Sequence, residues 1–158
     1  RFNLERNFDL ITSNACFQWF EDLETALAKY KNMLRKDGVI SFSTFGPLTF
    51  EELNIALKDV LKNASIGVNN FIPKEKIEKI LSQNFGEAKI KETRYEESFV
   101  CLKDLLYKIK YSGIRGEGFG GKTFLGRQLL NKLETTYLNK FKRIKATYQV
   151  FFCQGKKS

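Results

Sequence analysis

The sequence lacks histidine altogether, and only three of its 158 residues are cysteines. Without histidine the chain cannot build a Ser-His-Asp triad or a Cys-His pair, and it lacks a common ligand of catalytic zinc. Cys16, Cys101 and Cys153 are odd in number and far apart in sequence, so they indicate neither a disulfide framework nor a zinc site. We therefore expect no metal site and no histidine-dependent catalysis.

Long apolar segments are also missing. No run approaches the roughly 20 apolar residues that span a bilayer, and no charged start, apolar stretch and small-residue cleavage site marks a secretory signal. These absences predict a cytoplasmic protein that makes no membrane contact. The chain is 42% hydrophobic and 14% aromatic, which is enough for one packed core. Because the sequence begins at Arg1, we expect it to be a piece of a longer chain.

Charge is present but unevenly placed, with a formal net charge of +9. Residues 81–158 contain 16 of the 27 basic residues and only 7 of the 18 acidic ones, so they hold the whole excess. Such an asymmetry concerns partners and association rates, and it favours an acidic partner. Nucleic acid, a membrane surface and an acidic protein all fit this pattern, as does a basic surface with no dedicated partner.

The first 46 residues predict a strand, a helix and a second strand. Residues 8–13 form a short β-prone run, and residues 21–34 carry apolar side chains at helical spacing. Asp22 is the expected N-cap of this helix and Gly38 lies just past its expected end. Residues 39–44 then form a second strand. This order predicts a βαβ unit whose two strands are parallel neighbours.

The remainder continues the α/β pattern. Thr49 and Glu52 match a capping box in front of a helix over 50–61. Further elements are expected as helices from Pro73 to about residue 83, over 102–112 and over 123–136, and as strands over 88–99 and 146–153. We expect residues 1–46, 85–100 and 145–158 to form a sheet core, with helical insertion and lid segments over 47–84 and 101–137.

A glycine-rich loop matches two nucleotide-binding patterns. Residues 116–123 fit G-x-x-x-x-G-K-[ST], and Gly116, Gly118 and Gly121 fit G-x-G-x-x-G. Both motifs require a strand directly before the loop, whereas residues 102–110 have helical periodicity. We therefore interpret residues 113–121 as a lid loop whose glycines permit positive φ angles.

The segment from Ser13 to Trp19 follows the first expected strand. Ligands of open α/β sheets bind at the carboxyl ends of strands, so small and amide side chains here are candidates for ligand contact. The alternative is structural: Asn14 would make an Asx-turn and Trp19 would pack in the core.

These residues resemble class I S-adenosylmethionine-dependent methyltransferases. The resemblance lies in Phe8–Ala15, Gln18-Trp19, Leu34–Gly38 and Ser43–Gly46, and it covers the fourth and fifth strands of that fold. Three further segments are similar to the malonyl-acyl-carrier-protein O-methyltransferase family of biotin synthesis: Phe50–Leu53, Leu105–Gly113 and Tyr148–Phe152. The resemblance implies a C-terminal part of a Rossmann-like sheet with a helical lid, with the first three strands absent.

The resemblance also implies roles for individual residues. Ser13, Asn14 and Ala15 would lie near the methionyl end of S-adenosylmethionine, with Gln18 and Trp19 between cofactor and substrate. Phe45 would line the same pocket. Lys110, Arg115 and Lys122 are candidates for holding the substrate carboxylate, Arg115 first because a guanidinium grips a carboxylate with two hydrogen bonds. The alternative for each lid cation is a solvated side chain.

The implied reaction is methylation of the free carboxylate of malonyl-acyl carrier protein, which needs no catalytic residue. The basic half would then bind the acidic carrier protein. Another small-acid carboxyl methyltransferase and a non-catalytic module that binds nucleic acid or a carrier protein remain alternatives. Because the family's glycine-rich cofactor loop is missing, we expect the 158 residues alone to bind S-adenosylmethionine weakly or not at all.

Overall fold

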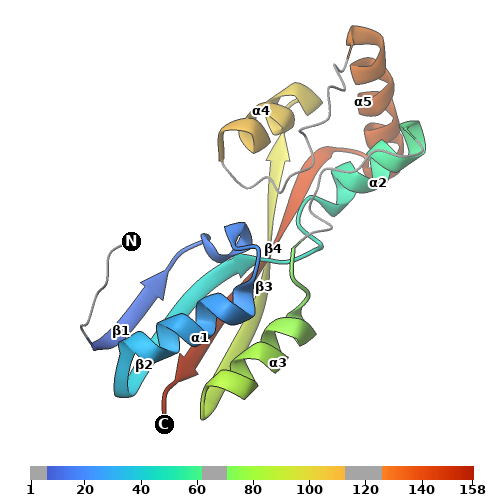
Figure 1. The fold of residues 1–158 in the computed structure, drawn as a ribbon. Coiled ribbons are helices and arrows are strands. Elements are labelled where there is room, and N and C mark those ends of the chain that lie inside the picture. Colours follow the sequence, from blue (N-terminus) through green and yellow to red (C-terminus); the bar gives the residue numbers. More distant parts are fainter. Residues whose placement is uncertain (1–6, 62–70, 113–125) are drawn as a thin grey trace. The chain divides into compact units, whose positions relative to one another are not determined.

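The computed structural model describes residues 7–61, 71–112 and 126–158 (Figure 1). Their elements, in chain order, are β1 (Phe8–Ser13), η1 (Phe17–Trp19), α1 (Leu23–Met33), β2 (Leu34–Phe45), α2 (Glu51–Val60), α3 (Lys74–Asn84), β3 (Glu87–Phe99), α4 (Leu102–Ser112), α5 (Arg127–Phe141) and β4 (Ile144–Lys156). Every strand and helix expected from the sequence is present, although several extend beyond the predicted ends.

One four-stranded sheet runs in the order β1-β2-β4-β3. β1 and β2 are parallel neighbours, with Leu10 opposite Val39, as the βαβ pattern predicts. β4 lies antiparallel to β2, with Phe42 opposite Cys153. β3 is an edge strand, which agrees with its polar sequence.

Helix α1 begins as predicted but ends differently. The Asp22 side chain accepts a hydrogen bond from the backbone N–H of Thr25 at 3.1 Å, which is the expected N-cap. At the other end the chain enters β2 directly at Leu34, so the prediction that Gly38 follows the helix end as its cap is wrong. A Cβ at Gly38 would lie 2.9 Å from the carbonyl oxygens of Arg35 and Phe8. The glycine therefore allows close approach of β1 at its irregular register.

The predicted capping box of α2 is also wrong. Phe50 is the N-cap residue, in the left-handed conformation, and its side chain makes no capping bond. The Thr49 hydroxyl instead donates to the carbonyl of Gln149 at 3.1 Å. Glu52 accepts hydrogen bonds from Thr147. Thr49 and Glu52, which their spacing predicted to cap the helix, therefore form hydrogen bonds with β4 instead.

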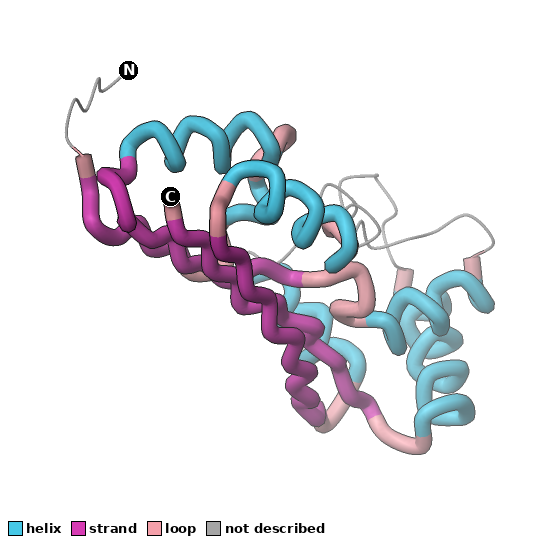
Figure 2. Tube along the Cα trace, turned by 90° about the horizontal axis from the view of Figure 1, so that it is seen from below, coloured by secondary structure: helices cyan, strands magenta, loops and turns pink. Residues whose placement is uncertain are grey.

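The chain divides into two compact units. Unit 1 comprises Arg1–Gly46, Ile72–Thr93 and Val150–Ser158, and unit 2 comprises Pro47–Phe71 and Arg94–Gln149. In unit 1, α1 and α3 pack on one face of the sheet (Figure 2). The core there consists of Phe17, Leu23, Leu27, Leu34, Ile40, Phe42, Ile77, Ile80, Leu81, Phe85, Phe151 and Cys153.

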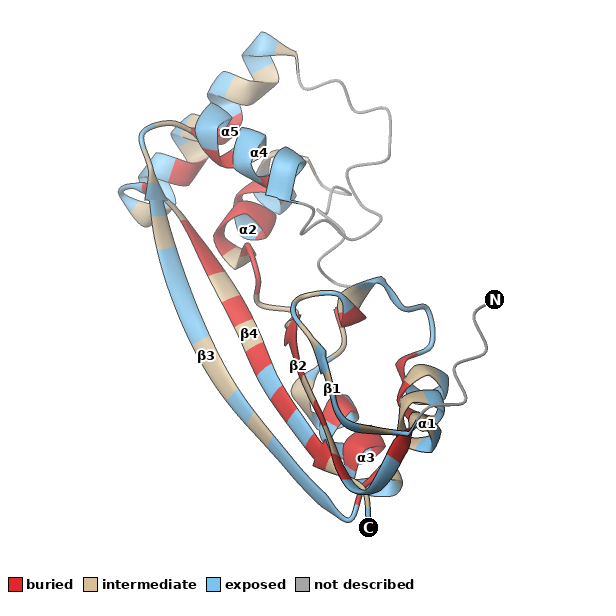
Figure 3. Ribbon diagram, turned by 90° about the vertical axis from the view of Figure 1, so that its left-hand side faces the viewer, coloured by how far each residue is buried: buried red, intermediate tan, exposed pale blue. Residues whose placement is uncertain are grey.

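Unit 2 buries its own apolar residues where α2 packs against α5. Tyr137 of α5 is fully buried, and its hydroxyl donates to the carbonyl of Lys145. Leu102 and Leu105 of α4 and Leu133 of α5 are likewise fully buried. Figure 3 shows this burial on the helices, and it shows buried residues alternating with partly buried and exposed ones along β4.

No helix within the described residues is long and apolar enough to cross a membrane. The glycine-rich loop at 113–121 lies outside the described residues. The element before it is helix α4, so the strand that a phosphate-binding loop requires is not there.

Candidate functional site

A polar turn follows β1 at the carboxyl end of the parallel pair. Asn14 leaves the strand there, and its side-chain oxygen accepts a hydrogen bond from the hydroxyl of Ser43 on β2 at 2.6 Å. The same hydroxyl accepts from the backbone N–H of Ala15 at 3.0 Å. Two neighbouring strands thus join their polar side chains at the edge where ligands of such sheets bind.

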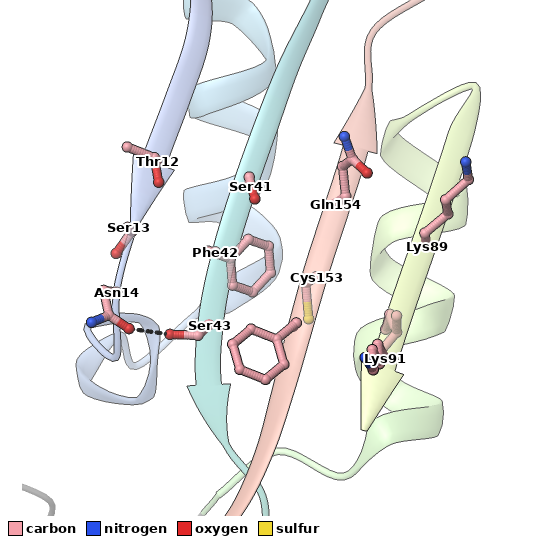
Figure 4. A pocket seen from close by; sticks show the side chains of 12 residues that line it. Thr12, Ser13, Asn14, Ser41, Phe42, Ser43, Lys89, Lys91, Cys153 and Gln154 are labelled. Carbon is pink, nitrogen blue, oxygen red and sulfur yellow. Dashed lines mark hydrogen bonds between the residues drawn. The ribbon is translucent and has the colours of Figure 1, made fainter. Parts of the chain in front are cut away.

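An open pocket of about 450 Å³ lies beside this turn (Figure 4). All of its residues belong to unit 1. They come from all four strands and the turn after β1: Thr12, Ser13, Asn14, Ser41, Phe42, Ser43, Lys89, Ile90, Lys91, Phe152, Cys153 and Gln154. Hydroxyl, amide and ammonium groups give this pocket many hydrogen-bond donors.

The pocket lies on the sheet face away from α1 and α3. Side chains alternate between faces along a strand, so Ile40 and Phe42 enter the core while Ser41 and Ser43 lie on the other face. Leu10 on β1 is 57% exposed. Our sequence reasoning missed Ser41 and Ser43 as site residues, although the apolar–polar alternation of Ile40–Ser43 already indicated them.

The turn holds its remaining predicted residues in different ways. The Gln18 side-chain nitrogen donates to the carbonyl of Ala15, while its buried Oε1 has no hydrogen-bond partner among the described residues. Ala15 has a φ of 50°, the left-handed region. Trp19 is 54% exposed, which rules out the alternative that it packs in the core. Phe17 takes the core position instead, 4.3 Å from Phe42 between ring centroids.

Phe45, the predicted pocket residue on β2, ends that strand and is partly buried. The predicted lid cations fall in a different part of the chain. Lys110 is exposed on α4, with its ammonium 5.3 Å from the centroid of the Tyr111 ring. Arg115 and Lys122 lie outside the described residues.

Other basic groups of unit 2 are ion-paired. Lys145 contacts Glu96 at 2.6 Å and Glu52 at 3.4 Å, and Arg143 also pairs with Glu96. Lys108 pairs with Glu97 at 3.2 Å. Part of the positive excess is therefore neutralised within unit 2, whereas Lys103 and Lys110 of α4 and Arg127 and Lys132 of α5 are exposed.

These contacts shift several acid–base equilibria. The hydrogen bond from Lys145 lowers the pKa of Glu96, and the hydrogen bond from Tyr148 lowers the pKa of Glu97. Burial raises the pKa of the Cys153 thiol to about 12, so this sulfur is a protonated core group at neutral pH. The predicted reaction needs no general base, so we assign none of these shifted groups a part in it.

Curated relatives of this chain share a name. Malonyl-[acyl-carrier protein] O-methyltransferase from Bacillus cereus is 32% identical over 161 residues, covering 96% of this chain and 59% of the relative. The protein of the same name from Acetivibrio thermocellus is 30% identical over 170 residues, covering 98% of this chain and 59% of the relative. The chain thus spans about 59% of the length of these two relatives.

A family model described as a methyltransferase domain matches residues 3–42, which include β1, α1 and the polar turn. The resemblance to methyltransferases is confirmed. YcgJ from Bacillus subtilis has the same fold with a TM-score of 0.56 at 15% identity, covering 96% of this chain and 64% of that one. BH2331 from Bacillus halodurans C-125, provisionally assigned as a methyltransferase, has a TM-score of 0.56 at 14% identity, with 96% and 65% covered.

The α/β fold class expected from the sequence is therefore confirmed by these two structures. Absence of the family's first three strands stays a prediction. The methyltransferase match ends at Phe42, one residue before Ser43. It therefore covers the turn after β1 but not the serine on β2 that binds it.

Proposed function

We propose that this chain supplies the C-terminal part of an S-adenosylmethionine-dependent O-methyltransferase that acts on the free carboxylate of a malonyl group carried by acyl carrier protein. One observation carries the proposal. The polar turn after β1, which lies inside the methyltransferase match at the carboxyl end of the parallel strands, borders the donor-rich pocket on the sheet face away from α1 and α3. The names of the curated relatives supply the substrate class.

The residues present suit one side of a cofactor site. S-adenosylmethionine carries a carboxylate and polar ribose and amino groups. The end of β1 and the turn after it offer the Ser13 hydroxyl, the Asn14 amide and the Gln18 Oε1, which has no hydrogen-bond partner among the described residues. Exposed Trp19 adds a flat apolar surface beside them. When bound, the cofactor supplies an activated methyl group. These side chains would bind and orient it, and Gln18 and Trp19 would lie toward the substrate.

The chemistry asks little of the protein beyond positioning. A malonyl carboxylate is already ionised at neutral pH, so its oxygen can attack without a general base. Holding oxygen, methyl and sulfur in line supplies the rate enhancement. A chain without histidine is therefore compatible with this reaction. We further propose that a basic side chain, Arg115 before Lys110 or Lys122, holds the substrate carboxylate.

We propose that unit 2 binds the carrier protein. Lys103 and Lys110 are exposed on α4, beside the exposed rings of Tyr107 and Tyr111. Acyl carrier proteins are small and strongly acidic, so this helix offers them complementary charge and steers the encounter. Nucleic acid remains the alternative partner for such a surface.

The test uses the natural protein that contains these 158 residues, methyl-labelled S-adenosylmethionine and malonyl-acyl carrier protein. We expect base-labile label on the carrier protein. Reversing charge in Lys103→Glu/Lys110→Glu should lower kcat/KM for the carrier substrate about tenfold at low salt. Lys79→Glu, on α3 of unit 1, is the matched control and should change it little.

Other outcomes identify the alternatives. Label on free small carboxylic acids but not on the carrier protein would indicate a different small-acid methyltransferase. Salt-sensitive DNA binding without any methyl transfer would contradict the proposal and favour the non-catalytic module. Calorimetry on the 158-residue chain by itself should detect weak cofactor binding or none, and micromolar affinity would contradict the expectation that the cofactor loop lies elsewhere.

A further inference from the structure

Ser43 occupies a connecting position that the methyltransferase match does not include. It lies on β2, directly after Phe42, which pairs with Ser13 of β1. Ser43 is only 7% exposed. Its hydroxyl contacts two successive residues of the turn, Asn14 and Ala15, and its carbonyl also accepts from the Ala15 N–H at 3.1 Å.

The hydrogen bonds of this hydroxyl determine which way the Asn14 amide faces. A serine hydroxyl has one hydrogen to donate and lone pairs to accept with. Since the Ala15 N–H donates to the oxygen at 3.0 Å, the hydroxyl hydrogen is free for Asn14 Oδ1 at 2.6 Å. The Asn14 nitrogen then faces away from Ser43 (Figure 4). No group within the described residues accepts a hydrogen bond from it.

Ser43 also supports the backbone of the turn. Ala15 has a φ of 50°, a conformation that residues with a Cβ adopt only where the surroundings hold them. Both the hydroxyl and the carbonyl of Ser43 bind its N–H, and the Gln18 side chain binds its carbonyl. Ser43 therefore anchors the segment that reaches from Asn14 to Gln18.

We infer that Ser43 is a positioning residue, which presents the Asn14 amide nitrogen as a donor to an acceptor oxygen of the ligand, a carboxylate by preference. A carboxylate is preferred because hydrogen bonds to a charged acceptor are the stronger ones. This inference rests on the proposed function for the identity of the ligand, S-adenosylmethionine. The orientation of Asn14 itself rests only on the contacts within unit 1.

The first test measures orientation without any ligand, by NMR of the natural protein. In Ser43→Ala we expect amide hydrogen exchange at Ala15 to become about tenfold faster, together with shifted side-chain amide signals of Asn14. Ser43→Thr keeps a hydroxyl and should restore both. Ser41→Ala, two residues earlier on the same face, is the control and should change neither. Unaltered Asn14 and Ala15 signals in Ser43→Ala would overturn the inference.

The second test measures S-adenosylmethionine affinity by calorimetry. We expect about tenfold weaker binding in Ser43→Ala, near-normal binding in Ser43→Thr, and a loss of about 100-fold or more in Asn14→Asp. The aspartate still accepts from Ser43 but has no hydrogen to donate and repels a carboxylate. Ser82→Ala on α3 serves as the control.

Equal affinity in Ser43→Ala and the unaltered protein would contradict the positioning role. If the unaltered protein bound no S-adenosylmethionine at all, the proposed function would fail. The exchange measurement would still decide whether Ser43 sets the orientation of Asn14, so the two failures are distinguishable.

Discussion

The two units place polar groups beside their strands in opposite ways. In unit 1, Ser43, Asn14 and Ala15 form a neutral cluster that borders an open pocket. In unit 2, Glu52 is 3% exposed and carries a charge into the interior, where it binds the backbone N–H and hydroxyl of Thr147 at 3.0 and 2.6 Å. The unit 1 cluster leaves the Asn14 amide nitrogen as a donor for a ligand, whereas both carboxylate oxygens of Glu52 accept hydrogen bonds within unit 2.

This difference shows that a buried polar side chain and a polar side chain at a pocket edge have different roles. A buried carboxylate is stabilising only when hydrogen bonds and a cation replace its water, and Glu52 has both, because Lys145 lies 3.4 Å away. A neutral amide at a pocket edge costs less free energy than a buried charge when one of its hydrogen bonds is not made. Its free donor is therefore available to a ligand. We therefore expect substitutions in unit 2 to affect stability and those in the unit 1 cluster to affect binding.

The largest expected effect is at Glu52. Glu52→Ala leaves two donors of Thr147 without an acceptor and Lys145 without one of its carboxylates, so we expect a loss of about 3–5 kcal/mol in the free energy of unfolding. Glu52→Gln, which keeps the shape, should lose less. Urea unfolding followed by circular dichroism measures both. Equal stability of Glu52→Ala and the unaltered protein would show that this cluster has no structural role.

The second largest effect on stability is expected at a glycine, and a glycine in each unit allows the comparison. In Gly38→Ala the new Cβ would lie 2.9 Å from two carbonyl oxygens, and we expect a loss of about 1–3 kcal/mol. Gly126, before α5, has open space around its Cβ position and a φ of −56°. Gly126→Ala should therefore stay within about 0.5 kcal/mol of the unaltered protein. Thermal unfolding ranks the two, and the reverse order would contradict the close approach at Gly38.

The smallest expected effect is a loss of stability as the pH falls. Hydrogen bonds lower the pKa of Glu96 and Glu97 in unit 2 from 4.5, and of Asp22 in unit 1 from 3.8. Each lowered pKa contributes stability that is present above the ordinary value and is lost as pH falls through the folded-state value. Amide protection should therefore begin to weaken in unit 2 at a higher pH than around Asp22.

Hydrogen exchange between about pH 6 and pH 3 follows this loss residue by residue. In Glu96→Gln the acid-dependent weakening of unit 2 should become shallower, because one of its titrating groups is gone. An unchanged acid profile in that variant would show that the contacts of Glu96 with Lys145 and Arg143 do not contribute.

Local patterns were sufficient for much of unit 1. The β-prone run at 8–13, the N-cap Asp22 and the apolar spacing of α1 involve neighbours in sequence, and the βαβ rule then fixed the parallel pair. Ser13 and Asn14, predicted to contact the ligand, line the pocket of unit 1. Their assignment to the methionyl end of a cofactor stays a prediction.

What the sequence could not show depends on partners more than 25 residues away. Ser43 meets Asn14 across 29 positions, and Glu52 meets Thr147 across 95. Sequence spacing predicted a capping box between Thr49 and Glu52. In the structure, Glu52 binds Thr147 of β4 instead. Gly38 looked like a helix cap for a similar reason, since the approach of Phe8 depends on sheet pairing.

The way in which the chain alternates between its two units limits what truncation experiments can show. The backbone passes between them after Gly46, Phe71, Thr93 and Gln149, so neither unit is a continuous stretch of sequence. A truncation after Thr93 would take away Val150–Ser158, the strand segment that pairs with β2, along with Arg94–Gln149, the larger part of unit 2. Deletion mapping would therefore assign the loss of one unit to the other. Only point substitutions of the kind compared above can separate their contributions.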